Sequence, residues 1–394
     1  MDFIPKSKRF KEVLTKYGLD GAIVLSPENF FYLTGLSGHQ LSVSRTPGFS
    51  LAVISADSKT PVHITTMDFE EPSFRLAATG NYVIQKYDTW VGAGTRDELL
   101  GSKGKIPSQR LTSFDVLHKF LDALDLNSKK VGIEMAYTPV SYFQQVKQMF
   151  PEAEFYDISD LLIEMRSVKD PDEIAIFRTL CSAADHAFLQ VSEIARIGVS
   201  ERELVECFRK HALASGVCVP SAWSMFSAGS NSSRLTLPTN KIVQPGEVIK
   251  FDAGVNAEFK FYTTDTSRTW VMDGADAELY ALKDRLFEAQ RKMITAAKPG
   301  ITFNELFLTG YEYVKEKFPK YVRGHMGHSI SLGPATAEDP YISPNNHRKL
   351  VPGMILAVEA PFYISEYNGF NIEDMILITE KGAEILTPKT PHYL

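Results

Sequence analysis

Four acidic residues in the second half of this 394-residue chain lie within or at the end of apolar, strand-like runs. They are Asp252, Asp265, Glu359 and Glu373. A carboxylate is almost never buried without a partner. A fold that packs these runs into its core must therefore bring the carboxylates to groups that compensate their charge, and the simplest shared partner is a cation.

The first two carboxylates flank a predicted hairpin. Residues 249–254 and 261–269 read as strands joined by the polar segment 256–258. Such a hairpin would place Asp252 and Asp265 about 5 Å apart. Two carboxylates that close repel each other unless a proton or a cation lies between them. Turns and surfaces also use aspartate freely, so this pair alone does not decide the question.

A histidine between glycines adds a second kind of ligand. His328 stands in the segment Gly324-His325-Met326-Gly327-His328-Ser329, and glycine is typical of backbone that approaches something closely. A lone histidine is more often a core residue, but four acids with one imidazole suit Mn, Co, Fe or Zn. With bridging carboxylates, five ligands are enough for two divalent ions about 3.5–4 Å apart.

The two parts of the chain show different patterns. Residues 1–160 alternate between helices (10–17, 113–124) and strands (21–25, 50–54, 130–134), which predicts an α/β domain. Residues 161–394 predict an α+β domain with antiparallel strands. Its helices are expected at 171–197, 200–215, 276–297 and 303–317, and its strands at 247–256, 260–271, 354–364 and 371–379.

Composition narrows the class of protein. The net charge of -6 gives no sign of a nucleic-acid partner. The chain lacks an apolar signal segment near Met1 and any stretch of about 18 apolar residues, so we expect no membrane partner. Cys181, Cys207 and Cys218 form no C-x-x-C pair and read as free thiols. These features predict a soluble cytoplasmic protein and do not exclude a small charged substrate.

The ordered set Asp, Asp, His, Glu, Glu resembles the metal-site motifs of the creatinase/aminopeptidase P/prolidase family, which has the pita-bread fold. Residues 166–174 resemble the family's domain junction, and Tyr32-Leu33-Thr34-Gly35 resembles its N-terminal domain. The resemblance implies a creatinase-like N-terminal domain (1–160) and a pita-bread catalytic domain (161–394). It also implies that Asp252 binds one metal ion, that Asp265 and Glu373 bridge, and that His328 and Glu359 bind the second.

Three positions depart from the family pattern. Leu235 and Ala335 stand where the family's peptidases carry histidines that polarise the scissile carbonyl, and Asn371 stands where many members carry an arginine. The resemblance places these three positions, Tyr262 and Glu338 in the substrate pocket. Candidates to replace the histidines are His325, Glu338, Asp339, Arg234 and His39.

Two of these candidates carry structural expectations. On a straight strand His325 would face away from His328, unless the chain bends at Gly327. By resemblance to prolidase dimers, the loop that carries His39 reaches the active site of the other subunit, which implies a homodimer. A solvated loop residue is the simpler interpretation of His39.

The resemblance implies a metal-dependent hydrolase of an amide or related C–N bond, by default an Xaa-Pro dipeptidase. Glu359 would pass a water proton to the leaving nitrogen. The alternative is a non-peptidase of the creatinase or ectoine hydrolase type, or a lyase, since fold does not fix function. A catalytically inactive binding module is disfavoured because all five ligand positions are kept.

Overall fold

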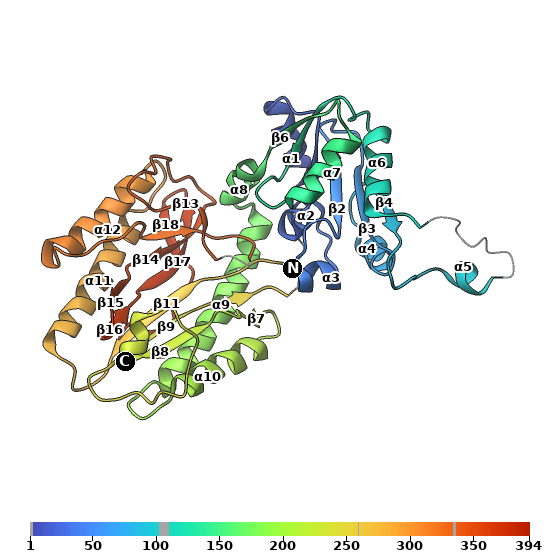
Figure 1. Cartoon of the computed structure of the whole chain (residues 1–394). Coiled ribbons are helices and arrows are strands. Elements are labelled where there is room, and N and C mark those ends of the chain that lie inside the picture. The colour runs from blue at the N-terminus through green and yellow to red at the C-terminus, as the bar shows by residue number, and fades with distance from the viewer. Residues whose placement is uncertain (1–2, 102–109, 259, 334–335) are drawn as a thin grey trace. The chain divides into compact units, whose positions relative to one another are not determined.

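The computed structural model describes residues 3–101, 110–258, 260–333 and 336–394. The chain forms two compact units, Asp2–Leu162 and Ile163–Leu394 (Figure 1). Each unit has its own sheet and its own hydrophobic core. No helix among the described residues is long and apolar enough to cross a membrane.

The N-terminal unit is built on a mixed six-stranded sheet in the order β4-β3-β2-β1-β5-β6. The central pair β1–β2 is antiparallel, whereas β1–β5, β5–β6 and β3–β4 are parallel. All residues of β1, β2 and β3 are buried, as expected of strands covered on both faces. The strands are β1 (Gly21–Val24), β2 (Leu51–Ser55), β3 (Val62–Met67), β4 (Tyr82–Tyr87), β5 (Lys130–Ile133) and β6 (Glu154–Asp157).

Helices connect the strands of this sheet. They are α1 (Ser7–Lys16), α2 (Pro27–Thr34), α3 (His39–Ser44), α4 (Glu71–Ala77), α5 (Arg96–Leu100), α6 (Ser113–Ala123), α7 (Val140–Met149) and, running into the second unit, α8 (Ser159–Ser167). The buried carboxylate of Glu134 accepts hydrogen bonds from Ser26 and Asn29, which ties the end of β5 to the start of α2. The α/β pattern predicted for this part is therefore confirmed.

The C-terminal unit contains an antiparallel sheet in the order β13-β12-β14-β17-β11-β9-β8, with β18 also paired to β17. Its strands are β8 (Met225–Ala228), β9 (Val248–Ala253), β11 (Thr266–Val271), β12 (Gly327–Ser329), β13 (Glu338–Tyr341), β14 (Ile355–Glu359), β17 (Glu373–Thr379) and β18 (Gly382–Ile385). Two small antiparallel pairs accompany it, β7 (Val219–Pro220) with β10 (Val255–Asn256) and β15 (Phe362–Ile364) with β16 (Asn368–Phe370).

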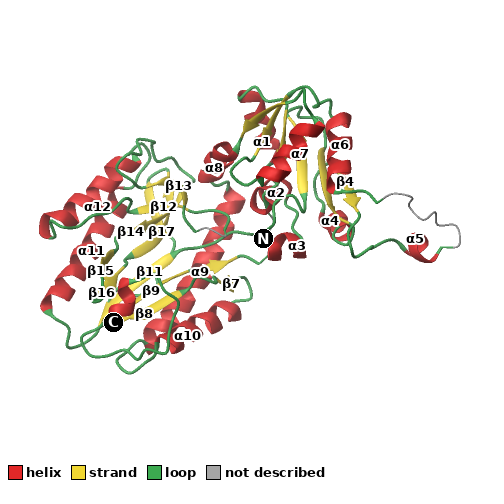
Figure 2. Ribbon diagram, viewed as in Figure 1, coloured by secondary structure: helices red, strands yellow, loops and turns green. Residues whose placement is uncertain are grey.

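Two pairs of helices cover this sheet (Figure 2). Helix α9 (Pro171–Ile194) packs on α10 (Glu201–Ala214), and α11 (Ala277–Ala296) packs on α12 (Phe303–Lys317). The short helix η1 (Gly229–Ser233) follows β8. Helix α10 contacts β8, and α11 contacts β11, β14 and β18. The α+β architecture predicted for this part is thus confirmed.

The sheet of the C-terminal unit consists of two halves joined by one narrow seam. Strands β8, β9 and β11 form one half, and β12, β13, β14, β17 and β18 form the other. They meet between β11 and β17, whose register contains a single pair, Ser267 opposite Glu373. The acidic residues singled out from the sequence gather at this seam.

Three predicted strands are wrong in their limits. The run predicted at 247–256 is divided at Gly254 into β9 and β10, which pair with different strands. Strand β11 begins at Thr266 rather than at residue 260, because Phe261 has a φ of 62°, a value that a β-strand cannot contain. Residues 262 and 263 form only isolated bridges. The run predicted at 354–364 is divided into β14 and β15 near Pro361, which has no N–H group for a sheet hydrogen bond.

Candidate metal centre

A row of side chains crosses the seam of the sheet. The register places Glu359 opposite Glu373, Glu373 opposite Ser267, and Ser267 opposite Asp252. Residues directly opposite each other on neighbouring strands point to the same face. Asp265 lies two residues before Ser267, so strand alternation places it on that face as well. Four carboxylates from both halves of the sheet thus share one face.

Three of the candidate ligands lie closest together. Asp265, His328 and Glu373 each offer one ligand atom, and these atoms lie within 4.8 Å of one another. His328 Nε2 is 3.7 Å from Asp265 Oδ2, and His328 Nδ1 is 3.0 Å from the carbonyl oxygen of Ser329. A carbonyl can only accept, so Nδ1 carries the proton and Nε2 keeps its lone pair. This tautomer is the one that a metal requires of Nε2.

The carboxyl groups of this cluster hold protons strongly. Burial raises the pKa of Asp265 well above its usual value, and the charges of Asp252 and Glu359 raise it further. Burial, followed by the charges of Asp265 and Asp252, does the same to the pKa of Glu373. Burial raises the pKa of Asp252 to about 6, although Lys250 opposes the shift. The cluster lacks positive charge at its centre.

A divalent cation would supply the positive charge that the carboxylate cluster lacks. Asp265 Oδ1 is buried and has no hydrogen-bond partner in the part of the chain that the structure describes. Buried polar atoms are normally satisfied, so an orphaned carboxylate oxygen beside His328 and Glu373 matches a metal ligand. Carboxylate oxygens with one imidazole nitrogen are the donors expected for Mn, Fe, Co or Zn.

Glu359 has a different environment at one end of the row. Its Oε1 lies 3.3 Å from Arg323 Nη2 and 3.2 Å from His325 Nδ1. Burial acts to raise the pKa of Glu359, but His325, Arg323 and His328 together hold it below its usual value. Glu359 is therefore the carboxylate of the row that most readily stays ionised.

The chain bends between His325 and His328. Gly327 has a φ of 134°, and a Cβ added to it would lie 2.2 Å from the carbonyl oxygen of Ala357. Only glycine fits this close approach. This is the bend that would bring His325 to the side of His328, and the two rings lie 6.2 Å apart.

Asn371 also belongs to the cluster. Its Nδ2 lies 3.3 Å from Asp252 Oδ2 and 3.5 Å from Glu373 Oε2. Tyr262 is fully buried and its hydroxyl donates to Glu173 of α9 at 2.9 Å.

The remaining predicted residues lie outside the row. Glu338 pairs with Arg166 at 2.6 Å, and Asp339 pairs with Arg348. The Arg234 side chain donates to Asn231. Leu235, on the loop after η1, is 70% exposed and thus does not pack into an enclosed wall. His39, the exposed first residue of α3, belongs to the N-terminal unit, and Ala335 lies outside the described residues.

Four polar residues beside the acids were not predicted from the sequence. Lys250 precedes Asp252 by two residues on β9, so strand alternation could have placed it on the face of the acids but could not have shown that it is buried. Arg323 contacts Glu359, and Thr336 hydrogen-bonds to Asp265. Burial and the charges of Asp252 and Glu359 raise the pKa of Tyr363. For these three, the sequence contains no signal that we can identify.

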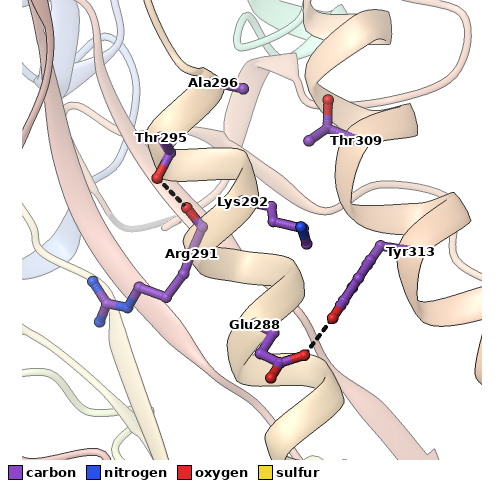
Figure 3. Close-up of a pocket in the computed structure, with 7 residues that line it drawn as sticks. All are labelled: Glu288, Arg291, Lys292, Thr295, Ala296, Thr309 and Tyr313. Atoms are coloured by element: carbon purple, nitrogen blue, oxygen red, sulfur yellow. Dashed lines mark hydrogen bonds between the residues drawn. The ribbon is translucent and has the colours of Figure 1, made fainter.

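A groove between α11 and α12 is separate from the acid row. Figure 3 shows its lining, which includes Arg291, Lys292 and Tyr313. Arg291 donates to Asp374, whose side chain must face away from that of its neighbour Glu373 on β17. The groove therefore lies on the helix-covered side of the sheet, whereas the acids occupy the other side.

Comparison with known proteins identifies the class. The sequence pattern of metallopeptidase family M24 matches residues 175–380, more than half of the chain, and that of the creatinase/prolidase N-terminal domain matches residues 6–168. The chain belongs to metallopeptidase family M24. It is accordingly a metal-dependent, peptidase-like hydrolase with a divalent metal cofactor.

Individual relatives agree with this membership. An Xaa-Pro dipeptidase from Pyrococcus horikoshii is 25% identical over 97% of this chain and 96% of its own length. One from Lactobacillus helveticus is 33% identical over 65% of this chain and 70% of its own length. The solved structure of an Xaa-Pro dipeptidase from Bacillus anthracis superposes with a TM-score of 0.81 at 24% identity, covering 99% of both chains. This likeness confirms the predicted fold.

The raised pKa values predict that metal uptake releases protons. Metal binding requires deprotonated carboxyls, whereas Asp252, with a pKa of about 6, together with Asp265 and Glu373 holds protons in the metal-free protein. We expect Mn²⁺ added at pH 6 to release at least one proton per chain. Calorimetry in two buffers of different ionisation enthalpy measures this number, and identical heats in both would contradict the prediction.

The raised pKa values of these carboxyl groups also predict how the stability of the metal-free protein changes with pH. A folded pKa raised above the usual value of 3.8 means that the unfolded chain binds fewer protons above that pH. This contribution to stability is therefore lost as pH rises from about 4 through 6. The melting temperature of the metal-free protein should fall over this range relative to that of the metal-loaded protein.

Proposed function

We propose that this chain hydrolyses the peptide bond of Xaa-Pro dipeptides with two divalent ions bound by Asp252, Asp265, His328, Glu359 and Glu373. The observation that carries the proposal is the convergence of Asp265, His328 and Glu373 within 4.8 Å, in line with the other two carboxylates. Relatives named Xaa-Pro dipeptidase support the choice of substrate.

The proposed ligand roles follow the order of the row. Asp265 and Glu373 would be shared between the ions, which agrees with their central place and their strongly raised pKa values. Asp252 would complete one ion's ligands, and His328 with Glu359 would complete the other's. When bound, the ions supply Lewis acidity to the substrate carbonyl and lower the pKa of the attacking water.

Glu359 is the proposed proton carrier. Its lowered pKa keeps it ionised at neutral pH, so it can accept a proton from the attacking water. The same proton then moves to the leaving proline nitrogen as the C–N bond breaks. Arg323 and His325, both within 3.3 Å of Glu359 Oε1, hold the carboxylate in place during this transfer.

The proposal extends to the setting of the enzyme. We propose manganese among the candidate ions, a cytoplasmic location and a homodimer in which His39, at the start of α3 rather than in a loop, contributes to the neighbouring site. The three cysteines, all unpaired, agree with a reducing compartment. Chain mass in solution and metal analysis of the purified protein address the dimer and the ion.

Hydrolysis of Ala-Pro and Leu-Pro tests the proposed function. We expect both to be cleaved in the presence of Mn²⁺, with activity lost on chelation and restored by the metal. Because Leu235 offers no imidazole to the carbonyl, and one such donor is worth about 10²–10³ in rate, kcat/KM should lie below about 10⁴ M⁻¹s⁻¹.

The same assay is also run with cyclic amides and amidines as substrates. Turnover of one of these with no cleavage of either dipeptide would overturn the proposal in favour of a creatinase-like activity. A kcat/KM for Ala-Pro in the ordinary efficient range would instead contradict only the expected effect of Leu235.

A further inference from the structure

Lys250 lies on the same face of the sheet as the acid row. It precedes Asp252 by two residues on β9 and pairs in register with Thr269 of β11. Thr269 Oγ1 in turn hydrogen-bonds to the backbone of Asn371. Lys250, Thr269 and Asn371 therefore form a second row beside the carboxylates, and Lys250 is its charged member.

The ammonium group of Lys250 is buried and has no direct ion-pair partner among the described residues, although Asp252 and Glu359 lie close enough for their charges to act on it. The residue is 0% exposed. Its Nζ makes one hydrogen bond, to the carbonyl oxygen of Arg234 at 3.4 Å, and lies 4.6 Å from the ring centre of Tyr363. Within the described ranges no carboxylate oxygen lies within ion-pair distance of it. Lysine is rarely buried unless paired, and an ammonium has three protons to donate.

When metal ions occupy the site, the carboxylates no longer balance the positive charge of Lys250. Under the proposed function, on which this step rests, two divalent ions balance the four carboxylates of the row. Arg323 already faces Glu359 at 3.3 Å. The positive charge of Lys250 thus remains available for an anion that arrives with the substrate.

A dipeptide places an anion at a suitable distance. Its free carboxylate lies one residue beyond the scissile carbonyl, about 3.8 Å along the chain. Lys250 lies two residues from Asp252 along a strand, about 7 Å between Cα atoms, and its own side chain spans the remaining distance. Carboxylate and ammonium form strong charge-assisted hydrogen bonds.

We propose that Lys250 binds the free C-terminal carboxylate of the substrate and thereby restricts this enzyme to substrates that end one residue after the cleaved bond. The ring of Tyr363 supports the ammonium group from one side. A peptide extended beyond this residue, or one with a blocked carboxyl group, would leave Lys250 buried without an anion.

The test compares Ala-Pro with Ala-Pro amide in the metal-loaded full chain. In Lys250→Met we expect KM for Ala-Pro to rise about 10- to 100-fold, the range for a lost charged hydrogen bond. In this variant the KM for Ala-Pro amide should stay unchanged, and each chain should still bind two metal ions. Lys250→Arg should recover part of the preference. Lys283→Met is the matched control, because Lys283 is also largely buried and stacks on a tyrosine, Tyr393, but on α11.

Binding of the product separates this inference from the proposed function. Titration of L-proline and of prolinamide into the metal-loaded protein needs no turnover. We expect Lys250→Met to weaken proline binding about 10- to 100-fold and to leave prolinamide unchanged. Equal losses for both ligands, unchanged proline affinity, or loss of metal would overturn the inference and assign Lys250 to the support of Asp252. Failure to cleave any dipeptide would overturn only the proposed function.

Discussion

Replacing Asp265 with alanine should lower kcat by at least about 10³-fold and reduce the metal occupancy of the proposed two-ion site, because metal-assisted activation of water supplies much of the rate in such sites. The reason lies in the position of its carboxylate. Asp265 is the residue that faces His328 at 3.7 Å and shares the 4.8 Å cluster with Glu373. Alanine at this position would also remove the buried Asp265 Oδ1, which has no hydrogen-bond partner among the described residues and is free to bind a metal ion.

The same substitution should leave the fold intact and even favour the metal-free state. Burial and nearby charges raise the pKa of Asp265, so its carboxylate is repelled when no cation is present. We expect the metal-free variant to melt at or above the temperature of the metal-free parent.

Kinetics, metal analysis and thermal melting together check this prediction. Asp273→Ala is a suitable control, since Asp273 is an exposed aspartate just beyond β11. Two tightly bound ions in Asp265→Ala would contradict the shared-ligand role, and loss of the folded state would show that Asp265 is needed for packing.

Replacing Asp374 with alanine should destabilise the protein by about 3–5 kcal/mol, the cost of leaving a buried charge unpaired. Asp374 is 0% exposed and accepts from Arg268 Nη2 at 2.7 Å and from Arg291 Nη2 at 2.8 Å. Gln290 and Thr387 also donate to it. Without this carboxylate, the fully buried guanidinium of Arg268 keeps only carbonyl partners.

The charge state of Asp374 supports the size of this effect. Burial alone would raise its pKa, but Arg268, His392 and Arg291 hold it well below the usual range. A depressed pKa means that the contribution to stability is present above the unfolded value of 3.8 and is lost as pH falls below it. The difference in the free energy of unfolding between the parent and Asp374→Ala should therefore reach its full size at pH 7.

Urea unfolding at pH 7, with metal saturating, measures the difference. Glu384→Ala provides the matched control, because it removes an Arg–carboxylate pair of similar length, 2.6 Å to Arg178, whose side chains on α9 and the edge strand β18 are about half exposed. Exposed pairs contribute at most about 1 kcal/mol. Similar losses in the two variants would refute the argument that burial decides the outcome.

The sequence allows the fold class and the convergence of the acids to be predicted because both depend on local patterns. Acidic residues within apolar runs must meet a partner, and Asp265, His328 and Glu373 do gather in one place. For His325 the sequence left two positions open, because its side depends on one backbone angle at Gly327, which the sequence does not determine. The start of β11 likewise depends on the left-handed conformation of Phe261.

Lys250 was missed for a different reason. A lysine in a strand ordinarily extends its charged end to solvent, and nothing in the one-dimensional pattern shows that this strand is enclosed on both faces. Only the register with β8 and β11, and the burial of the whole of β9, reveal that the ammonium group stays inside.

The narrow seam between the two halves of the C-terminal sheet gives the metal ions a mechanical role. Backbone pairing across the seam is limited to Ser267 and Glu373, so most hydrogen bonds between the two halves involve side chains, such as those of Thr269 to Asn371 and of Arg268 to Asp374. Under the proposed ligand set, Asp252 and Asp265 come from one side and His328, Glu359 and Glu373 from the other. The ions would then form further cross-links that hold the two halves of the sheet in register. The geometry needed for catalysis would form in the same step as these cross-links.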